Sequence, residues 1–115
     1  MTDTHSSEQL DTVFEALANK HRREIVYSLG LQPHSISQLA SQRKLSLPAI
    51  HKHIKLLERA DIVIRKKIGR TTILTLNRDS LLGLQSWLSQ YHAYWGHSTE
   101  SLENYNQYLE GGEEE

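Results

Sequence analysis

The sequence predicts a mainly α-helical protein with a small two-stranded β-wing. Apolar residues recur at intervals of three and four through most of the 115 residues, which is the spacing of amphipathic helices. Between Asp61 and Leu76 the spacing changes to a period of two, in a stretch rich in Ile, Val and Thr that is typical of strands. Cap and turn residues stand where one pattern gives way to the next, so the order of the elements can be predicted.

Two helices are predicted in the first third of the chain. Residues 1–7 are polar and are expected to form a mobile end, whereas residues 8–110 are expected to form one domain. The apolar side of the first helix is expected to consist of Leu10, Val13, Phe14 and Leu17. Asn19 is predicted to cap the second helix, which Gly30 and Pro33 close.

Two further helices are predicted to follow, joined by a tight connection. Ser35 and Gln38 have the spacing of a capping box, so a short third helix is expected to start there. Ser46 is expected to cap the fourth helix, with Pro48 in its first turn, where a missing N–H has no consequence. The buried stripe of the fourth helix is expected to consist of Ile50, Ile54 and Leu57.

The wing is predicted to be a hairpin of residues 61–67 and 71–76, with Gly69 and Arg70 between the strands. An isolated hairpin is marginally stable in water, so its apolar face is expected to pack on the helices. These elements, with the short third helix joined tightly to the fourth, describe a winged helix-turn-helix.

A long final helix and a C-terminal helical extension are predicted after the wing. Asp79 is expected to cap the final helix, and Gly96 is expected to bend or break it. Gly111 and Gly112 are expected to end the extension. Residues 111–115 are then predicted to be an acidic tail in solvent.

Basic and acidic residues are concentrated in different parts of the chain. Residues 43–78 contain ten basic residues and two acids, a formal charge of +8, although the net charge of the whole chain is −1. After Arg78 there are seven acids and neither lysine nor arginine. A local field of this sign attracts a polyanion whatever the net charge, and the major groove of double-stranded DNA admits one α-helix. The middle third is therefore predicted to bind double-stranded DNA.

The predicted DNA-binding surface combines the start of the fourth helix with the tip of the hairpin. Its residues are Ser46, Leu47, Pro48, His51, Lys52, Lys55, Lys66, Lys67, Arg70 and Thr71. The positive end of the helix dipole assists contact with phosphates at the first turn. The alternative for each cation is a charged side chain in solvent, and Arg65, Lys66 and Lys67 could protect a strand edge. Their coincidence on one predicted surface favours DNA.

The histidines of the fourth helix and of the second helix have different expected roles. His51 points away from the buried stripe of the fourth helix and is the better candidate for a DNA contact. His53 falls in line with that stripe and is expected to be structural. His21, Arg22 and Arg23, at the start of the second helix, are as compatible with phosphate contact as with pairing or solvation.

Several segments resemble the ArsR family of bacterial and archaeal repressors. They are residues 16–25, 36–40, 45–57, 60–63 and the wing at 69–70, and the resemblance covers about residues 8–95. It implies a dimeric repressor that acts at an inverted-repeat operator, with the first and last helices forming the dimer interface. The implied interface residues are Leu10, Val13, Phe14, Leu17, Leu84, Trp87, Leu88, Tyr91 and Trp95.

Two positions depart from the family pattern. Lys44 stands where the family often has glycine, and a left-handed backbone there would cost a non-glycine residue about 1 kcal/mol. Leu47 stands where a polar residue is common, so one base contact could be apolar, for example with a thymine methyl group.

The resemblance also raises the question of a sensor site. A thiolate metal site is excluded because the chain has no cysteine. The metal site that some members carry on the last helix has four ligand positions, which here hold Asp79, Leu81, His92 and Trp95. Zinc prefers about four N, O or S ligands, so neither a metal nor another cofactor is expected. The aromatic run that starts at Trp87 resembles a non-metal branch, in which it forms a dimer interface or, alternatively, a pocket for a small ligand.

Other classes of function have less support in the sequence. No Ser–His–Asp arrangement, phosphate-binding glycine loop or paired-carboxylate motif is evident, so the chain is not expected to be an enzyme. No apolar run reaches membrane-spanning length, so a cytoplasmic location without a membrane partner is expected. The leading hypothesis is a sequence-specific transcriptional regulator, most simply a repressor. The alternative is a protein-interaction module that uses the aromatic C-terminal helix. A small-molecule effector is left open.

Overall fold

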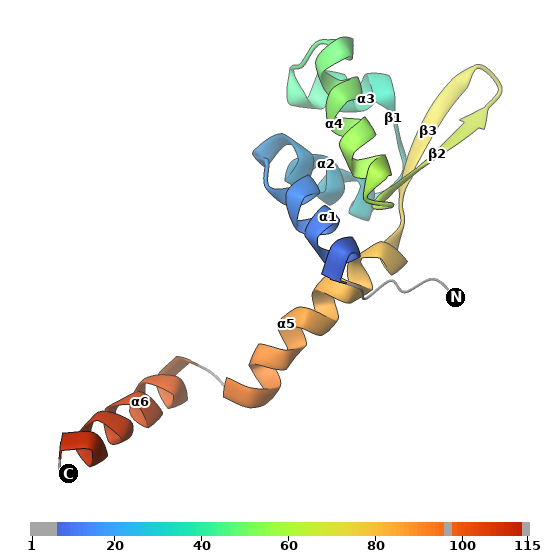
Figure 1. Ribbon diagram of the computed structural model, residues 1–115. Helices are drawn as coiled ribbons and strands as arrows, with labels where there is room; N and C mark the ends of the chain where they lie inside the picture. Colours follow the sequence, from blue (N-terminus) through green and yellow to red (C-terminus); the bar gives the residue numbers. More distant parts are fainter. Residues whose placement is uncertain (1–6, 96–97, 114–115) are drawn as a thin grey trace. The chain divides into compact units, whose positions relative to one another are not determined.

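The computed structural model describes residues 7–95 and 98–113. Its contacts divide the chain into two compact units, residues 1–84 and residues 85–115, which are described separately below. The single domain predicted for residues 8–110 therefore stays a prediction. The elements of the chain are, in order, α1 (Ser7–Leu17), α2 (Lys20–Leu31), β1 (His34–Ser35), α3 (Ile36–Arg43), α4 (Leu47–Arg59), β2 (Val63–Ile68), β3 (Thr71–Leu76), η1 (Arg78–Leu81), α5 (Leu82–Trp95) and α6 (Ser98–Glu113) (Figure 1).

Side-chain caps start three of the helices where the sequence predicts them. Asn19 accepts a hydrogen bond from the backbone N–H of Arg22 and so caps α2. Ser35 and Gln38 form both hydrogen bonds of a capping box at α3. Ser46 accepts from the N–H of Ala49 and caps α4.

The end of α2 differs from the prediction. Gly30 lies inside the helix, which continues to Leu31 and has Gln32 as its C-cap in extended backbone. The prediction that Gly30 closes the helix is therefore wrong, because no left-handed residue is needed there. A Cβ at Gly30 would lie 3.8 Å from Cδ2 of Leu76, so this face of α2 packs against β3.

The turn between α3 and α4 contains a left-handed residue that is not glycine. Lys44 has φ 56° and ψ 41° and is the C-cap of α3. We expect Lys44→Gly to raise the free energy of unfolding by about 0.5–1 kcal/mol, because glycine avoids the strain but adds freedom to the unfolded chain. Urea unfolding measures the change.

Lys44→Ala is the matched control for this prediction. Alanine removes the same charge but keeps a Cβ, so it should not stabilise the protein. An equal gain with alanine would show that charge, and not backbone conformation, is responsible.

The sheet has three strands, one more than predicted, in the order β1-β3-β2. The extra strand β1 pairs antiparallel with β3, His34 opposite Leu74. With only two residues, β1 is too short to show a period in the sequence. The β2–β3 hairpin turns at Gly69, whose φ of 63° suits the first central position of a type II′ turn.

The predicted first strand starts too early in the sequence. Asp61 has φ 60° and belongs to the turn after α4, and β2 begins at Val63. Nδ2 of Asn77 donates to the carbonyl of Asp61 at 2.9 Å, which ties this turn to the end of β3.

The hydrophobic core lies where the helices of the first unit meet the sheet. The predicted stripe of α4 is confirmed, because Ile50, Ile54 and Leu57 are fully buried. The hairpin packs on this core through Val63 and Leu74, as predicted. The other fully buried large side chains are Val13, Ile25, Leu39 and Ile62.

Two predictions about the C-terminal elements are wrong. Asp79 lies within η1, whose N-cap is Asn77 without a side-chain hydrogen bond, so Asp79 does not cap α5. The helix α6 continues through Gly111 and Gly112 to Glu113, since a helical glycine costs only about 1 kcal/mol and does not by itself end a helix. Gly96 and residues 114–115 lie outside the described residues. Within the described ranges, no helix has the length and apolar character needed to cross a membrane.

Candidate nucleic-acid interface

The first turns of α4 expose every residue predicted there to contact DNA. Pro48 occupies the first turn, where it needs no hydrogen-bond partner, and the buried stripe turns the polar side of the helix outwards. Leu47 is 51% exposed, so an apolar side chain stands among the polar ones. The exposed residues of this part of the surface are Ser46, Leu47, Pro48, His51, Lys52 and Lys55.

The tip of the hairpin supplies the second part of the surface. Lys66, Lys67, Arg70 and Thr71 are all exposed, and β2 has no buried residue after Val63. The hairpin thus extends beyond the core, with its cations around the Gly69 turn.

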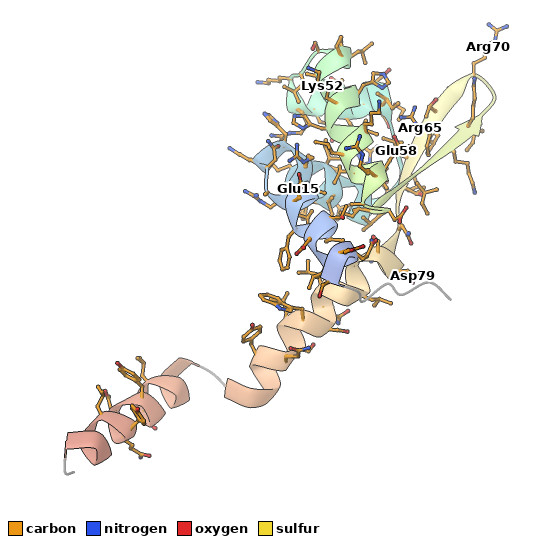
Figure 2. The ribbon with its side chains drawn as sticks, viewed as in Figure 1. Glu15, Lys52, Glu58, Arg65, Arg70 and Asp79 are labelled. Carbon is orange, nitrogen blue, oxygen red and sulfur yellow. The ribbon has the colours of Figure 1, made fainter. Side chains whose placement is uncertain are left out.

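The two parts lie on one surface. Leu47 and His51 of α4 line the same groove as Arg70 and Thr71 of the hairpin. Ser35, Ile36 and Ser37, at the start of α3, also line it. Figure 2 shows Lys52 and Arg70 at the same end of this unit. The arrangement places a helix and a flanking hairpin side by side, each carrying cations.

An ion pair holds the hairpin against α4. Nε and Nη2 of Arg65 donate to the two carboxylate oxygens of Glu58 at 3.1 and 2.9 Å. The hydrogen bonds to Glu58 raise the pKa of Arg65 above its ordinary value. Arg65 therefore positions the wing, a role that the sequence analysis missed. Glu58 is one of only two acids among the basic residues 43–78. This isolated acid is the feature of the sequence that could have indicated an ion pair.

The basic cluster at the start of α2 is directed into the protein. Arg22 donates through Nε to the carbonyl of Ala16 at 2.6 Å and through Nη2 to that of Glu15 at 3.4 Å. Arg23 donates to the carbonyl of Leu17 at 2.8 Å. The carbonyls of Ala16 and Leu17 lie at the end of α1, so the arginines cap the preceding helix. Pairing within the protein, one of the alternatives that the sequence left open, is therefore observed for both arginines.

His53 and His21 connect α2 to α4 and α3. Nη1 of Arg22 lies 3.2 Å from Nδ1 of His53, and Nη2 of Arg43 lies 3.3 Å from Nδ1 of His21. Arg43 also forms an ion pair with Glu24. A guanidinium cannot accept a hydrogen bond, so both Nδ1 atoms must be unprotonated to make these contacts. The structural role expected for His53 is confirmed.

This arrangement predicts that the protein is less stable in acid. Burial, followed by the charge of Arg22 and the neighbouring His21, lowers the pKa of His53 below its ordinary value of 6.5. The unfolded chain therefore binds more protons than the folded chain between these two pKa values, and stability decreases as the pH falls through 6.5. Urea unfolding at several pH values measures the slope.

His53→Asn tests the origin of this slope. The asparagine oxygen can accept from Arg22 but does not titrate, so the variant should have a shallower decline below pH 6.5. His51→Asn changes an exposed histidine on the same helix and should keep the wild-type decline. The same slope in wild type and His53→Asn would contradict the assignment.

The residues predicted for the dimer interface differ in exposure. Val13 is 1% exposed and is a core residue of its own subunit, so it is not available to a partner. Leu17 and Leu84 are packed partly against the core, and Leu10 is also half-buried. The side chain of Trp95 lies outside the described residues. The exposed members of the set are Phe14, Leu88 and Tyr91.

Trp87 and Tyr91 of α5 pack against each other. The rings of Trp87 and Tyr91 are 4.9 Å apart in an edge-to-face arrangement. Tyr91 nevertheless remains about half exposed, at 49%. The C-terminal unit therefore presents an aromatic surface.

A metal-binding group is absent from the described residues, where no cluster of three or more His, Asp or Glu has suitable geometry. Asp79 lies in η1, and the side chain of His92, which holds another of the four ligand positions, is not described.

Comparisons with known proteins agree with this architecture. A family model described as a helix-turn-helix domain matches residues 17–65. The chain is 30% identical over 100 residues to the helix-turn-helix-type transcriptional regulator Rv2034 of Mycobacterium tuberculosis, which covers 87% of this chain and 88% of the relative. An ArsR-like transcriptional regulator from Rhodococcus sp. RHA1 is 29% identical, with a TM-score of 0.68 over 84% of this chain and 92% of the other.

A third similarity concerns the fold alone. The homodimeric winged helix-turn-helix DNA-binding domain Mb0332 from Mycobacterium bovis has a TM-score of 0.62 and 18% identity, over 79% of this chain and 86% of the other. The arrangement of helices and wing is thus shared with proteins of very different sequence.

Proposed function

Because the chain belongs to the ArsR-like winged helix-turn-helix transcriptional regulators, which bind DNA, we propose that it is a homodimeric repressor acting at an inverted-repeat operator. The observation that supports this most directly is the groove shared by α4 and the wing. Residues 47 and 51 of the helix and residues 70 and 71 of the hairpin line it together. A helix in the major groove and a hairpin tip over the neighbouring backbone use such a surface.

The side chains of this surface indicate which residues would supply affinity for DNA and which would supply sequence specificity. Lys52, Lys55, Lys66, Lys67 and Arg70 supply affinity through phosphates, and this contribution depends on salt. Ser46, Leu47 and His51, at the start of α4, can approach base edges and supply specificity. Leu47 offers an apolar contact that suits a thymine methyl group.

Dimerisation would use the exposed apolar side chains of α1 and α5. Phe14, Leu88 and Tyr91 are all more than a third exposed, and aromatic residues are enriched in interface cores. The related fold from M. bovis is homodimeric. A twofold dimer would place its two α4 helices about 34 Å apart, in successive major grooves, and would therefore read an inverted repeat.

A pair of arginine variants tests the DNA surface. Arg70 stands at the tip of the hairpin, whereas Arg78 follows the other end of β3 and donates to the carbonyl of Gly30 at 3.3 Å. Arg70→Gln should lower the slope of log affinity against log salt by about 0.9, the contribution of one phosphate contact. Arg78→Gln removes the same charge and should keep the wild-type slope. Equal slopes for the two variants would contradict the placement of the wing on DNA.

The operator and the repressor role need their own measurement. Selection of bound sequences from random DNA should yield an inverted repeat, and sedimentation should show two chains per site. Binding of that site within a promoter should reduce transcription in vitro. Recovery of a single half-site bound by one chain, or increased transcription, would exclude this mode of action.

A further inference from the structure

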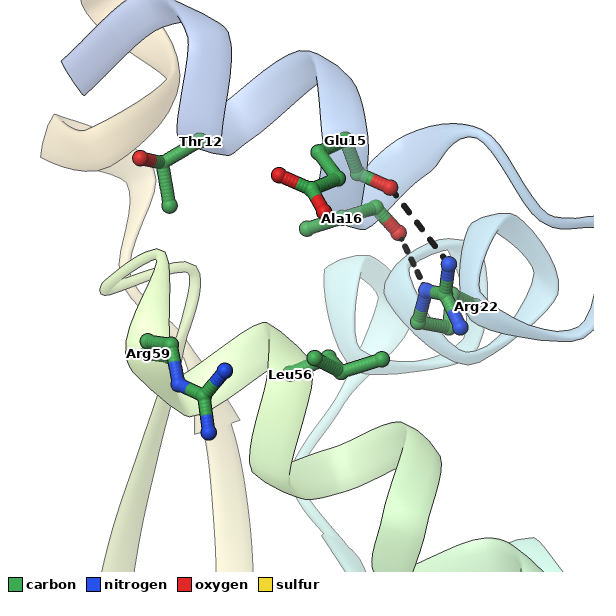
Figure 3. Close-up of a pocket in the computed structure, with 6 residues that line it drawn as sticks. All are labelled: Thr12, Glu15, Ala16, Arg22, Leu56 and Arg59. Atoms are coloured by element: carbon green, nitrogen blue, oxygen red, sulfur yellow. Dashed lines mark hydrogen bonds between the residues drawn. The ribbon is translucent and has the colours of Figure 1, made fainter. Parts of the chain in front are cut away.

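A second concave site lies between α1 and α4. It is a cleft lined by Thr12, Glu15, Ala16, Arg22, Leu56 and Arg59 (Figure 3). None of the ten residues predicted to contact DNA lines it. The cleft is therefore separate from the DNA surface, although one of its walls belongs to the helix that forms that surface.

Opposite charges face this cleft without meeting. Glu15 supplies a carboxylate from α1, and Arg59 supplies a guanidinium from the last turn of α4 (Figure 3). Among the described residues, neither side chain forms a hydrogen bond or an ion pair. Each charge is thus available to a ligand that carries the opposite charge.

Arg22 has a different part in the cleft. Its Nε and Nη2 donate to the carbonyls of Ala16 and Glu15 (Figure 3). Its Nη1 lies 3.2 Å from Nδ1 of His53. It therefore forms a fixed wall and adds a positive charge, while its main donor directions are taken. The two guanidinium groups and one carboxylate give the cleft a formal charge of +1.

Two apolar side chains, Ala16 and Leu56, also line the cleft. Ala16 is buried and belongs to the core, and Leu56 of α4 is half-buried. A small aliphatic group can lie against these two side chains while polar ends reach the walls. Such a distribution suits a molecule with an anionic and a cationic group on a short carbon skeleton.

We propose that this cleft binds a free α-amino acid. Its ammonium group is held by the carboxylate of Glu15, and its α-carboxylate by the planar guanidinium of Arg59, which can donate two parallel hydrogen bonds. The net positive charge of the cleft favours an acidic amino acid over a basic one. The regulator would then carry a site for a metabolite that does not overlap its DNA surface.

Amide chemical shifts of the full-length protein provide the test. L-glutamate, L-alanine and L-lysine are titrated separately to about 10 mM, since so small a ligand is expected to bind in the millimolar range or somewhat tighter. We expect L-glutamate to shift the amides of residues 12–16 and 56–59 at the lowest concentration, followed by L-alanine and then L-lysine. The absence of saturable shifts at these residues with all three compounds would overturn the proposal.

Charge-neutral variants identify the contacts. Glu15→Gln and Arg59→Gln should each weaken L-glutamate binding by about tenfold or more, because each removes a charge-assisted hydrogen bond. The matched controls are Asp11→Asn and Lys55→Gln, which remove the same charges from exposed positions of α1 and α4 outside the cleft. Equal weakening by the controls would show a general charge effect and would overturn the site.

A double-mutant cycle, measured by unfolding, tests whether Glu15 and Arg59 form an ion pair with each other instead of binding a ligand. If Glu15 and Arg59 bind each other in solution, the two substitutions will show a coupling energy, and the proposal fails. Additive effects agree with two charges held apart for a ligand. DNA affinity without added amino acid, measured for wild type and Glu15→Gln, should be equal, so a failure of this site is distinguishable from a failure of the proposed repressor function.

Discussion

The double substitution Lys52→Gln and Lys55→Gln is expected to weaken operator binding by about 10- to 100-fold at physiological salt. Both lysines are exposed on the polar side of α4, next to the groove that this helix shares with the wing. Each lost phosphate contact should also lower the slope of log affinity against log salt by about 0.9, so the double variant should lose nearly two. Fluorescence anisotropy with labelled operator over a range of salt concentrations measures both quantities.

The matched control keeps the charge at the same positions. Lys52→Arg and Lys55→Arg together should retain most of the affinity and the wild-type slope, because arginine also neutralises phosphate. Sedimentation of the glutamine variant should show an unchanged oligomeric state. Full DNA binding by that variant, with the aromatic helix still capturing another protein, would instead favour the interaction-module hypothesis.

Ile54→Ala is expected to lower the free energy of unfolding by about 2–5 kcal/mol, the range for large-to-small changes in well-packed cores. Ile54 is 0% exposed and lies in the middle of α4, within the core that also contains Ile50 and Leu57. A loss of this size is a large part of the total stability of a typical domain. Urea unfolding followed by circular dichroism measures it.

Ile64→Ala is the control, because it makes the same chemical change at a residue of β2 that is 45% exposed. We expect a loss of about 1 kcal/mol or less there, since little apolar area is removed from the core. Similar losses at both positions would mean that α4 is not packed as the structure shows it.

The sequence by itself determined the elements whose signals are local. Asn19, Ser35 and Ser46 cap helices where their spacing predicts, because a cap needs only backbone N–H groups two or three residues away. The stripe of Ile50, Ile54 and Leu57 is buried because the helical period places these side chains on one face.

Contacts between distant residues were decided by the tertiary structure. Gly30 lies inside its helix, on a face that packs against Leu76, and the strand at His34 exists only through its pairing with β3. The pairing of Glu58 with Arg65 depends on how the hairpin leaves α4.

In the candidate sites, too, some features depend on local sequence and others on the packing of distant segments. Exposure of the cations could be predicted from the period of α4 and the Gly69 turn, since both are properties of short segments. The placement of Glu15 and Arg59 on one cleft could not, because these residues are 44 positions apart and line the same cleft only when α1 packs against α4. Local periodicity fixes which way a side chain points from its own element, whereas its neighbours depend on how the elements pack.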